Sequence, residues 1–197
     1  MKPTAHTKVL DMGAEIAPQT KRELHFIDSY PWKNQLSAIN ISPEAIKLIK
    51  QYYPEIDAFV ADACQLPYPD KYFDIVYSNA VIEHLGCLEK QKKMAAEIAR
   101  VGKRWFVSSP NRRYPFEFHL RLPLVTWLPG RSYLWVGKII SYNHARNRYM
   151  FGLDHAGLRL MTASELKRCF PGSKIIKHRV TFMAETLVVV GGGHINA

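Results

Sequence analysis

The stretch Phe59–Leu85, FVADACQLPYPDKYFDIVYSNAVIEHL, decides the fold class. It begins with a short apolar run that ends at Asp62 and Ala63, and a second apolar run, Phe73–Tyr77, follows a polar crossing with two prolines. Short apolar runs that end in small or polar residues are typical of parallel strands buried in a layered α/β sheet. Ligands bind at the carboxyl ends of such strands, so a binding edge is expected at Asp62, Ala63 and Asn79.

Strand and helix signals alternate on both sides of this stretch. Further strands are predicted at 8–13, 36–40 and 105–110, with a closing antiparallel hairpin of strands at 175–182 and 186–190. Helices are predicted at 19–30, from Ser42 onward, at 88–100 and at 162–170, and Ser42 and Thr162 are suited to cap their helices. The alternation predicts a three-layer α/β/α fold, and 197 residues of ordinary composition predict one domain, 1–197.

Positive charge gathers in one segment. The chain has a net charge of +10, and Arg100–Arg148 holds ten lysines or arginines against a single acid, Glu117. Within it, residues 111–150 carry many aromatic and apolar residues, with helices predicted at about 119–128 and 131–142. We interpret 111–150 as a helical cap over the carboxyl ends of the strands. Its charge suits, in order of preference, a solvated lid, a lid on an anionic membrane surface, or nucleic acid.

Cysteine and histidine usage points to a reduced protein without a metal. Three cysteines and eight histidines are scattered without ligand spacing, so the sequence predicts no disulfide and no metal site. No apolar run is long enough to span a bilayer and no signal peptide is recognised, which predicts a cytoplasmic protein, with the membrane surface as an optional location. No feature of the sequence indicates an oligomeric state.

The pattern D-A-x-x-L-P-(aromatic)-P-D-x-x-F-D-x-V at residues 62–76, continued by Val81–Leu85, resembles class I S-adenosylmethionine-dependent methyltransferases of the small-molecule type, type 11-like. The resemblance implies a Rossmann-like, mostly parallel seven-stranded sheet, with an antiparallel last strand inserted between the fifth and sixth. It implies S-adenosylmethionine as the cofactor. The positions that match the cofactor edge of the family are Asp11, Gly13, Ala14, Asn40, Ile41, Asp62, Ala63 and Asn79.

The resemblance is incomplete at three places. The glycine turn of the family, D-x-G-x-G-x-G, reads DMGAEIA here, with Glu15 and Ala17 in place of the second and third glycines. Asn40 replaces the acid that binds the ribose hydroxyls in the family, and few residues precede the first strand, where relatives usually carry covering helices. These departures favour a second hypothesis, a binding or interaction module of methyltransferase fold without catalysis.

The resemblance also implies where an acceptor would lie. Glu83-His84 follows the fourth strand, and His84 is a candidate catalytic base, or else the pair only packs a short helix. Asn111, Glu117 and His119 follow the fifth strand and are candidates for substrate contact, or else polar residues on the rim of the cap. The acceptor is expected to be a small molecule or a lipid- or glycan-linked group, with oxygen favoured. Nucleic acid is disfavoured because residues 78–81 lack the N-P-P-(aromatic) motif.

Overall fold

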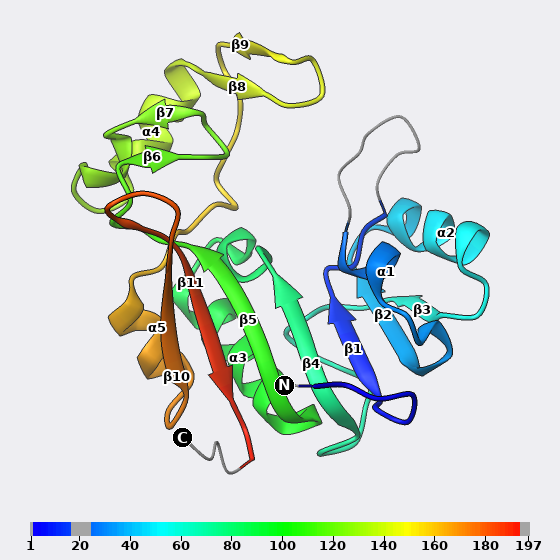
Figure 1. Cartoon of the computed structure of the whole chain (residues 1–197). Helices are drawn as coiled ribbons and strands as arrows, with labels where there is room; N and C mark the ends of the chain where they lie inside the picture. Colours follow the sequence, from blue (N-terminus) through cyan, green and yellow to red (C-terminus); the bar gives the residue numbers. More distant parts are fainter. Residues whose placement is uncertain (1, 17–24, 194–197) are drawn as a thin grey trace.

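The computed structural model describes residues 2–16 and 25–193 (Figure 1). One seven-stranded sheet runs through the molecule in the order β10-β11-β5-β4-β1-β2-β3. Its strands are β1 (Val9–Met12), β2 (Leu36–Asn40), β3 (Asp57–Val60), β4 (Phe73–Asn79), β5 (Gly102–Pro110), β10 (Lys174–Arg179) and β11 (Ala184–Gly191). Strands β1 to β5 pair in parallel, while β11 is antiparallel to both β5 and β10. The predicted sheet, with its antiparallel last strand inserted next to the fifth, is confirmed.

Helices cover both faces of the sheet because side chains alternate along each buried strand. One hydrophobic cluster joins strand residues such as Leu10 and Val76 to α3 (Leu88–Val101) and α5 (Ala163–Cys169). A second cluster joins the alternate residues, such as Val9 and Ile75, to α1 (Phe26–Ser29) and α2 (Pro43–Tyr52). Figure 1 shows the helices on the two sides of the strands. The fold is therefore the predicted three-layer α/β/α sandwich.

The predicted helix caps form as expected. The Ser42 hydroxyl accepts the backbone N–H of Ala45 at the start of α2, and Thr162 and Glu165 form a capping box at the start of α5. The helix predicted at 19–30 lies partly outside the described residues, and its described end holds only the four-residue α1. No helix in the described part of the chain is long and apolar enough to cross a bilayer.

The segment 111–150 lies beyond the carboxyl ends of β4 and β5, at the upper left of Figure 1. The prediction of a helix at 119–128 is wrong, because Arg121 and Leu124 adopt left-handed backbone conformations that no α-helix contains. Two small hairpins, a 3₁₀ turn and one helix make up the segment. They are β6 (Phe116–Glu117), β7 (Leu122–Pro123), η3 (Val125–Trp127), α4 (Ser132–Ile139), β8 (Ser141–Asn143) and β9 (Arg148–Met150).

The same segment has its own small hydrophobic core. Leu120, Val125 and Tyr133 pack with Leu158 and Leu160, which belong to the chain that returns toward α5. The tertiary contacts of this core depend on residues from beyond position 150, which the sequence pattern did not link to the segment. The helix predicted at 131–142 is present in shorter form, as α4.

Candidate functional site

Two cavities open at the carboxyl ends of the strands and share Gly13 as a wall. The first, about 310 Å³, is lined by Gly13, Ile39, Asn40, Ile41, Ala61, Asp62, Ala63, Cys64, Val81, His84, Leu85 and Lys90. The second, about 290 Å³, is lined by Asp11, Met12, Gly13, Glu15, His25, Phe26, Tyr77 and Asn79. The cofactor-edge residues predicted from the sequence therefore line one or other of these two cavities, except Ala14, which is buried in the hydrophobic core.

Gly13 connects the cavities because its position admits no side chain. Its φ of +76° is in the left-handed region, and a Cβ there would collide with the side chain of Val81. The backbone N–H groups of Gly13 and Ala14 both donate to the carbonyl of Ile39, at 2.8 and 3.0 Å. The turn after β1 is thus held directly by β2.

Asn40 is a structural link as well as a cavity wall. Its Nδ2 donates to the carbonyl of Ala14 at 3.0 Å, and its Oδ1 accepts the backbone N–H of Ser42 at 2.9 Å. The side chain is buried and joins the turn after β1 to the start of α2. One N–H and one lone pair of the amide are left for a ligand in the cavity.

Asp62 lines the same cavity as Asn40 and is exposed. Its Oδ1 accepts the backbone N–H of Cys64 at 2.8 Å, which fixes the turn that carries Ala63. Ile41 projects into the same space and is among the most exposed apolar side chains of the chain. An acid and an apolar side chain in the lining of one cavity suit a ligand with a flat ring and polar edge groups.

Asp11 is the acid of the second cavity. Only 4% of it is exposed, and burial raises its pKa from 3.8 to about 7. Burial, followed by the nearby Asp11 carboxylate, raises the pKa of Tyr77 to about 12. A buried acid of this kind is suited to a cationic group, since a positive partner would restore its ionised form.

A cluster of acids and histidines adjoins the first cavity. Glu83 and His84 lie on η2 (Ile82–Leu85), directly after β4, and the ring of His84 meets the ring of His119 edge-to-face at 4.9 Å. His119 Nδ1 lies 2.7 Å from Glu117 Oε1, and the Ser109 hydroxyl donates to Glu83 Oε2 at 3.1 Å. The fold thus brings Glu117 and His119, predicted as substrate contacts, beside His84, the candidate catalytic base.

The charges in the cluster perturb one another. Burial raises the pKa of Glu83 to about 7, in spite of the Ser109 hydrogen bond and the nearby His119. Partial burial, then His119, lowers the pKa of His84. Although desolvation opposes it, the hydrogen bond with Glu117 raises the pKa of His119. Perturbed titratable groups beside a cavity are typical of functional sites.

Asn111 does not join this cluster. Its side chain donates to the carbonyl of Ala184 at 2.7 Å and accepts the backbone N–H of Arg113, so that it ties the end of β5 to β11. Its cavity is a different one, shared with Lys177 and Phe182. Two residues of the site were not predicted from the sequence. Ser109, which donates to Glu83, could have been found from its position at the polar end of β5. Lys90, which lines the first cavity, had no signal in the sequence.

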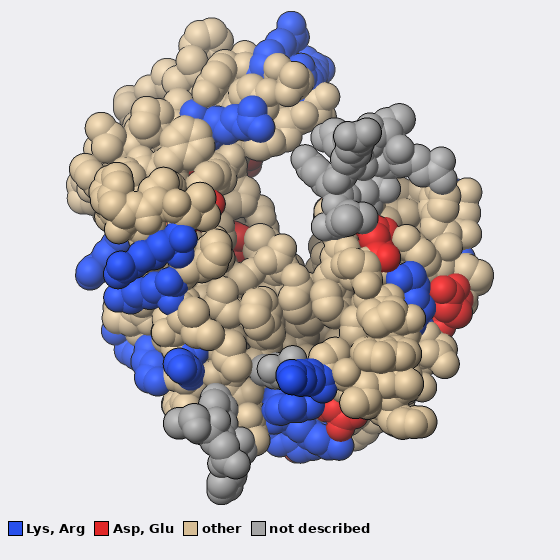
Figure 2. Space-filling view, in the orientation of Figure 1, with Lys and Arg blue, Asp and Glu red and all other residues tan. Residues whose placement is uncertain are grey.

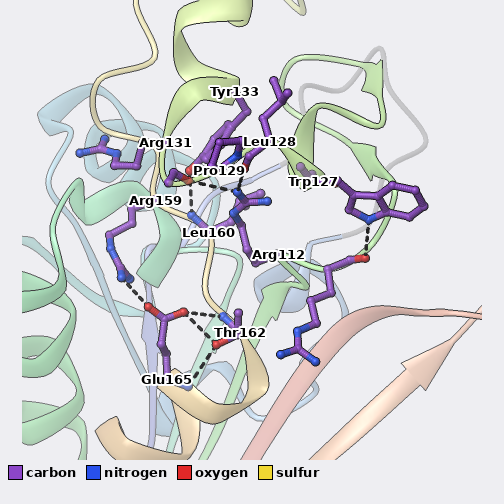
Figure 3. Close-up of a pocket in the computed structure, with 13 residues that line it drawn as sticks. Arg112, Trp127, Leu128, Pro129, Arg131, Tyr133, Arg159, Leu160, Thr162 and Glu165 are labelled. Atoms are coloured by element: carbon purple, nitrogen blue, oxygen red, sulfur yellow. Dashed lines mark hydrogen bonds and ion pairs between the residues drawn. The ribbon is translucent and has the colours of Figure 1, made fainter.

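A larger cavity, about 720 Å³, lies elsewhere and shares no lining residue with the two strand-end cavities. Figure 3 shows Arg112, Arg131 and Arg159 around it. Arg112 donates to the carbonyls of Leu128 and Gly130, and Arg131 to those of Ala156 and Leu158, while Arg159 pairs with Glu165. Arg131 therefore links the segment 111–150 to the returning chain, whereas Arg112 bonds within the segment and Arg159 pairs with a residue of α5.

Sequence comparison places the match in the first half of the chain. Residues 16–104 match the family model of the methyltransferase domain. A probable S-adenosylmethionine-dependent methyltransferase of Mycobacterium tuberculosis (strain ATCC 25618 / H37Rv) is 29% identical over 98 residues, which are 50% of this chain and 31% of that protein. Ajmaline N-methyltransferase of Rauvolfia serpentina is 34% identical over 99 residues, which are 47% of this chain and 31% of that protein. The chain therefore spans only 31% of the length of these relatives.

Solved structures share the fold over nearly the whole chain. An S-adenosylmethionine-dependent methyltransferase from Methanosarcina mazei has a TM-score of 0.59 at 13% identity, covering 95% of this chain and 92% of that one. PigF with SAH has a TM-score of 0.56 at 17% identity, covering 96% of this chain and 51% of that one. At these identities the likeness shows the fold.

The strand order and the solved structures show the fold of class I S-adenosylmethionine-dependent methyltransferases, and residues 16–104 resemble the methyltransferase domain of that class in sequence. The cofactor of this class is S-adenosylmethionine. The protein fits it on its own geometry, because two cavities that meet at Gly13 suit a ligand with a nucleoside part and an amino-acid part. The match to the family model begins at Ile16, so Gly13 and Glu15 of the altered glycine turn lie outside it, while Ala17 lies inside it.

Proposed function

We propose that the protein transfers the methyl group of S-adenosylmethionine to an oxygen atom of a small-molecule or lipid- or glycan-linked acceptor. The observation that carries the proposal is the place of His84, which lines the first cavity and contacts His119 of the acid and histidine cluster. The cavity and the cluster thus offer adjoining sites for a donor and an acceptor. Methyl transfer depends mainly on holding the two partners in line.

Each cofactor group has a suitable protein group. In the proposed arrangement, the adenosine lies in the first cavity between Asp62 and Ile41, with Ala63 beside it and Asn40 at the ribose. The methionine part lies in the second cavity, where the Asp11 carboxylate faces its ammonium group and Asn79 forms part of the wall. The acceptor lies against His84, Glu83 and His119. The bound cofactor would supply an activated methyl group: the acceptor oxygen would form a bond to the methyl carbon as the carbon–sulfur bond breaks, its hydroxyl proton would pass to water, and S-adenosylhomocysteine would leave.

Calorimetry with S-adenosylmethionine tests the cofactor half of the proposal. Asp62→Asn removes the charge from an exposed aspartate that also closes a turn, and it is expected to weaken binding about tenfold, because hydrogen bonds to charged groups contribute about 1.5–3 kcal/mol. Asp154→Asn is the matched control, since Asp154 is an exposed aspartate that accepts the backbone N–H of Ala156 in a similar turn. Absence of binding at millimolar cofactor would favour the second hypothesis, a module without catalysis.

Release of S-adenosylhomocysteine tests the catalytic half. We expect release to depend on the acceptor when the protein is assayed with a panel of phenols, hydroxy acids and glycolipids, and to fall sharply in His84→Ala. A protein that binds the cofactor and releases no product with any hydroxylated acceptor would instead support the binding module. Release that is unchanged in His84→Ala would separate the cluster from the reaction.

We also propose that the segment 111–150 contacts an anionic membrane surface, consistent with a lipid-linked acceptor and a cytoplasmic location. Trp135 in the segment is 70% exposed, and Phe151, directly after it, is 77% exposed. None of the lysines and arginines of the segment forms an ion pair with a described carboxylate. Figure 2 shows basic side chains on this part of the molecule and below it. Arginine with exposed tryptophan is favourable at such an interface.

Co-sedimentation with vesicles tests the membrane proposal. Binding is expected to vesicles with phosphatidylserine, to weaken at high salt because charges are screened, and to weaken further in Trp135→Ser. Phe182→Ser is the control, since Phe182 is 85% exposed but lies between β10 and β11. Equal sedimentation with neutral and anionic vesicles would contradict the proposal.

A further inference from the structure

We propose that Glu83, His84 and His119 bind a divalent transition-metal ion beside the first cavity. Each side chain offers one ligand atom, and the three atoms lie within 4.8 Å of one another. Metal–ligand bonds to imidazole nitrogen and carboxylate oxygen are about 2.0–2.2 Å long, so that ligand atoms on opposite sides of one ion are about 4–4.4 Å apart. Small side-chain rotations would therefore bring the three atoms into contact with a single ion.

The carboxylate of Glu83 is the observation that points to a ligand. The residue is 0% exposed, and its Oε1 has no hydrogen-bond partner in the described structure, although its Oε2 accepts the Ser109 hydroxyl. Burying a carboxylate oxygen without a partner is costly, and such orphaned groups are rare in native proteins. A cation between Glu83 and the two histidines would compensate for this cost.

The surroundings of His119 already have the form of an outer shell around a metal. Its Nδ1 pairs with Glu117 Oε1 at 2.7 Å, which leaves Nε2 free to act as the ligand. Glu117 is itself buried and is held through its other oxygen by the backbone N–H of Leu120. Metal-binding histidines generally use their second nitrogen in this way, and the carboxylate orients the ring.

The ligand set selects the kind of ion. Two imidazoles and one carboxylate suit zinc, manganese, cobalt or iron(II) better than magnesium or calcium, which prefer oxygen ligands. Three protein ligands leave coordination positions open, as catalytic sites do. Because His84 is exposed and lines the first cavity, the open side of the ion would face that cavity.

This inference deepens the proposed function, on which the role of the ion rests. Such an ion would lower the pKa of an acceptor hydroxyl beside it, so that the hydroxyl would lose its proton to water more readily before its oxygen attacks the methyl carbon. His84, predicted from the sequence as a base, then acts as a ligand. The sequence prediction of no metal site considered only spacing along the chain, whereas His119 reaches the cluster through the fold.

Metal binding can be measured without an acceptor. The full chain, treated with a chelator, is titrated with zinc chloride by calorimetry and with cobalt chloride by visible absorption. We expect one ion per chain, with affinity at least tenfold lower in Glu83→Gln and His119→Ala, and about 10–100-fold lower in Glu117→Gln. His178→Ala is the control, because His178 is an exposed histidine on β10. S-adenosylmethionine binding is expected to persist in the three site variants, which separates this test from that of the cofactor.

Two results would overturn the proposal. One is the absence of a stoichiometric site for zinc and cobalt in the native protein. The other is an affinity that falls no more in His119→Ala than in His178→Ala, which would indicate adventitious binding. Pulsed electron paramagnetic resonance of bound manganese supplies a readout that needs no variant: two imidazole nitrogens are expected, and none would contradict the site.

Discussion

The buried carboxyl of Asp11 makes the stability of the fold depend on pH. Its pKa is 3.8 in the unfolded chain and about 7 in the folded protein, because burial disfavours the charged form. The folded state therefore binds more protons than the unfolded state between these values. Stability from this group is present at about pH 4 and is lost as pH rises toward 7, by roughly 4 kcal/mol before any relaxation of the structure.

Asp11→Asn removes this titration while keeping the size of the side chain. The variant is expected to be more stable than the native protein at pH 8, by about 1–3 kcal/mol once relaxation is allowed for, and close to it at pH 4.5. Urea unfolding at a series of pH values measures the difference. Subtracting the two curves cancels the other titrating groups, including Glu83, whose pKa is also raised to about 7.

The difference in unfolding free energy between Asp11→Asn and the native protein at pH 8 decides whether the Asp11 carboxyl titrates near pH 7 in the folded state. If Asp11→Asn destabilises the protein by the same amount at pH 4.5 and pH 8, the carboxyl is not titrating near 7 in the folded state. Asp154→Asn, the same substitution at an exposed aspartate, serves as the control. Added S-adenosylmethionine is expected to stabilise the native protein more at pH 8 than at pH 5, since its ammonium group favours the ionised carboxylate.

Three further substitutions test the altered cofactor edge. Glu15→Gly is expected to tighten S-adenosylmethionine binding several-fold, as measured by calorimetry. An exposed carboxylate about 4 Å from that of the cofactor costs about 1 kcal/mol in water and more at lower dielectric. Unchanged affinity at low and high salt would show that Glu15 points away from the cofactor. Gly13→Ala is expected to lower Tm and cofactor affinity together, because of its positive φ and the collision with Val81; native-like values of both would contradict the geometry. Asn40→Asp is expected to destabilise the protein by about 1–3 kcal/mol in urea unfolding, because it replaces the Nδ2 donor to the Ala14 carbonyl by a second acceptor. Tighter cofactor binding without loss of stability would refute the structural role of the Asn40 amide.

The sheet was predictable because its signals are local. Apolar runs such as Phe73–Tyr77 form buried strands wherever helices cover both faces, and the caps at Ser42 and Thr162 start helices through contacts within one turn. The order of the strands came from the resemblance, since periodicity alone does not fix which strand lies beside which.

The segment 111–150 was not predictable in the same way. Its apolar residues suggested helices, but they pack against Leu158 and Leu160, and turns at Arg121 and Leu124 divide the chain into short pieces. The contacts within the acid and histidine cluster could not be predicted from the sequence for the same reason. Glu83 and His84 are neighbours in sequence, whereas the contact with His119 and the hydrogen bond from Ser109 depend on how β4, β5 and the segment meet.

The structure also bears on whether the altered glycine turn argues against cofactor binding. The turn after β1 keeps its shape through Gly13, whose N–H, with that of Ala14, is bonded to Ile39, and through Asn40, which holds the carbonyl of Ala14. These bonds do not involve the side chain of Glu15, which is exposed. Replacement of the second glycine therefore changes the charge at the cavity more than the shape of the turn. A cofactor edge that retains its shape and gains a carboxylate should bind S-adenosylmethionine with a salt-dependent affinity, and this favours the methyltransferase over the binding module.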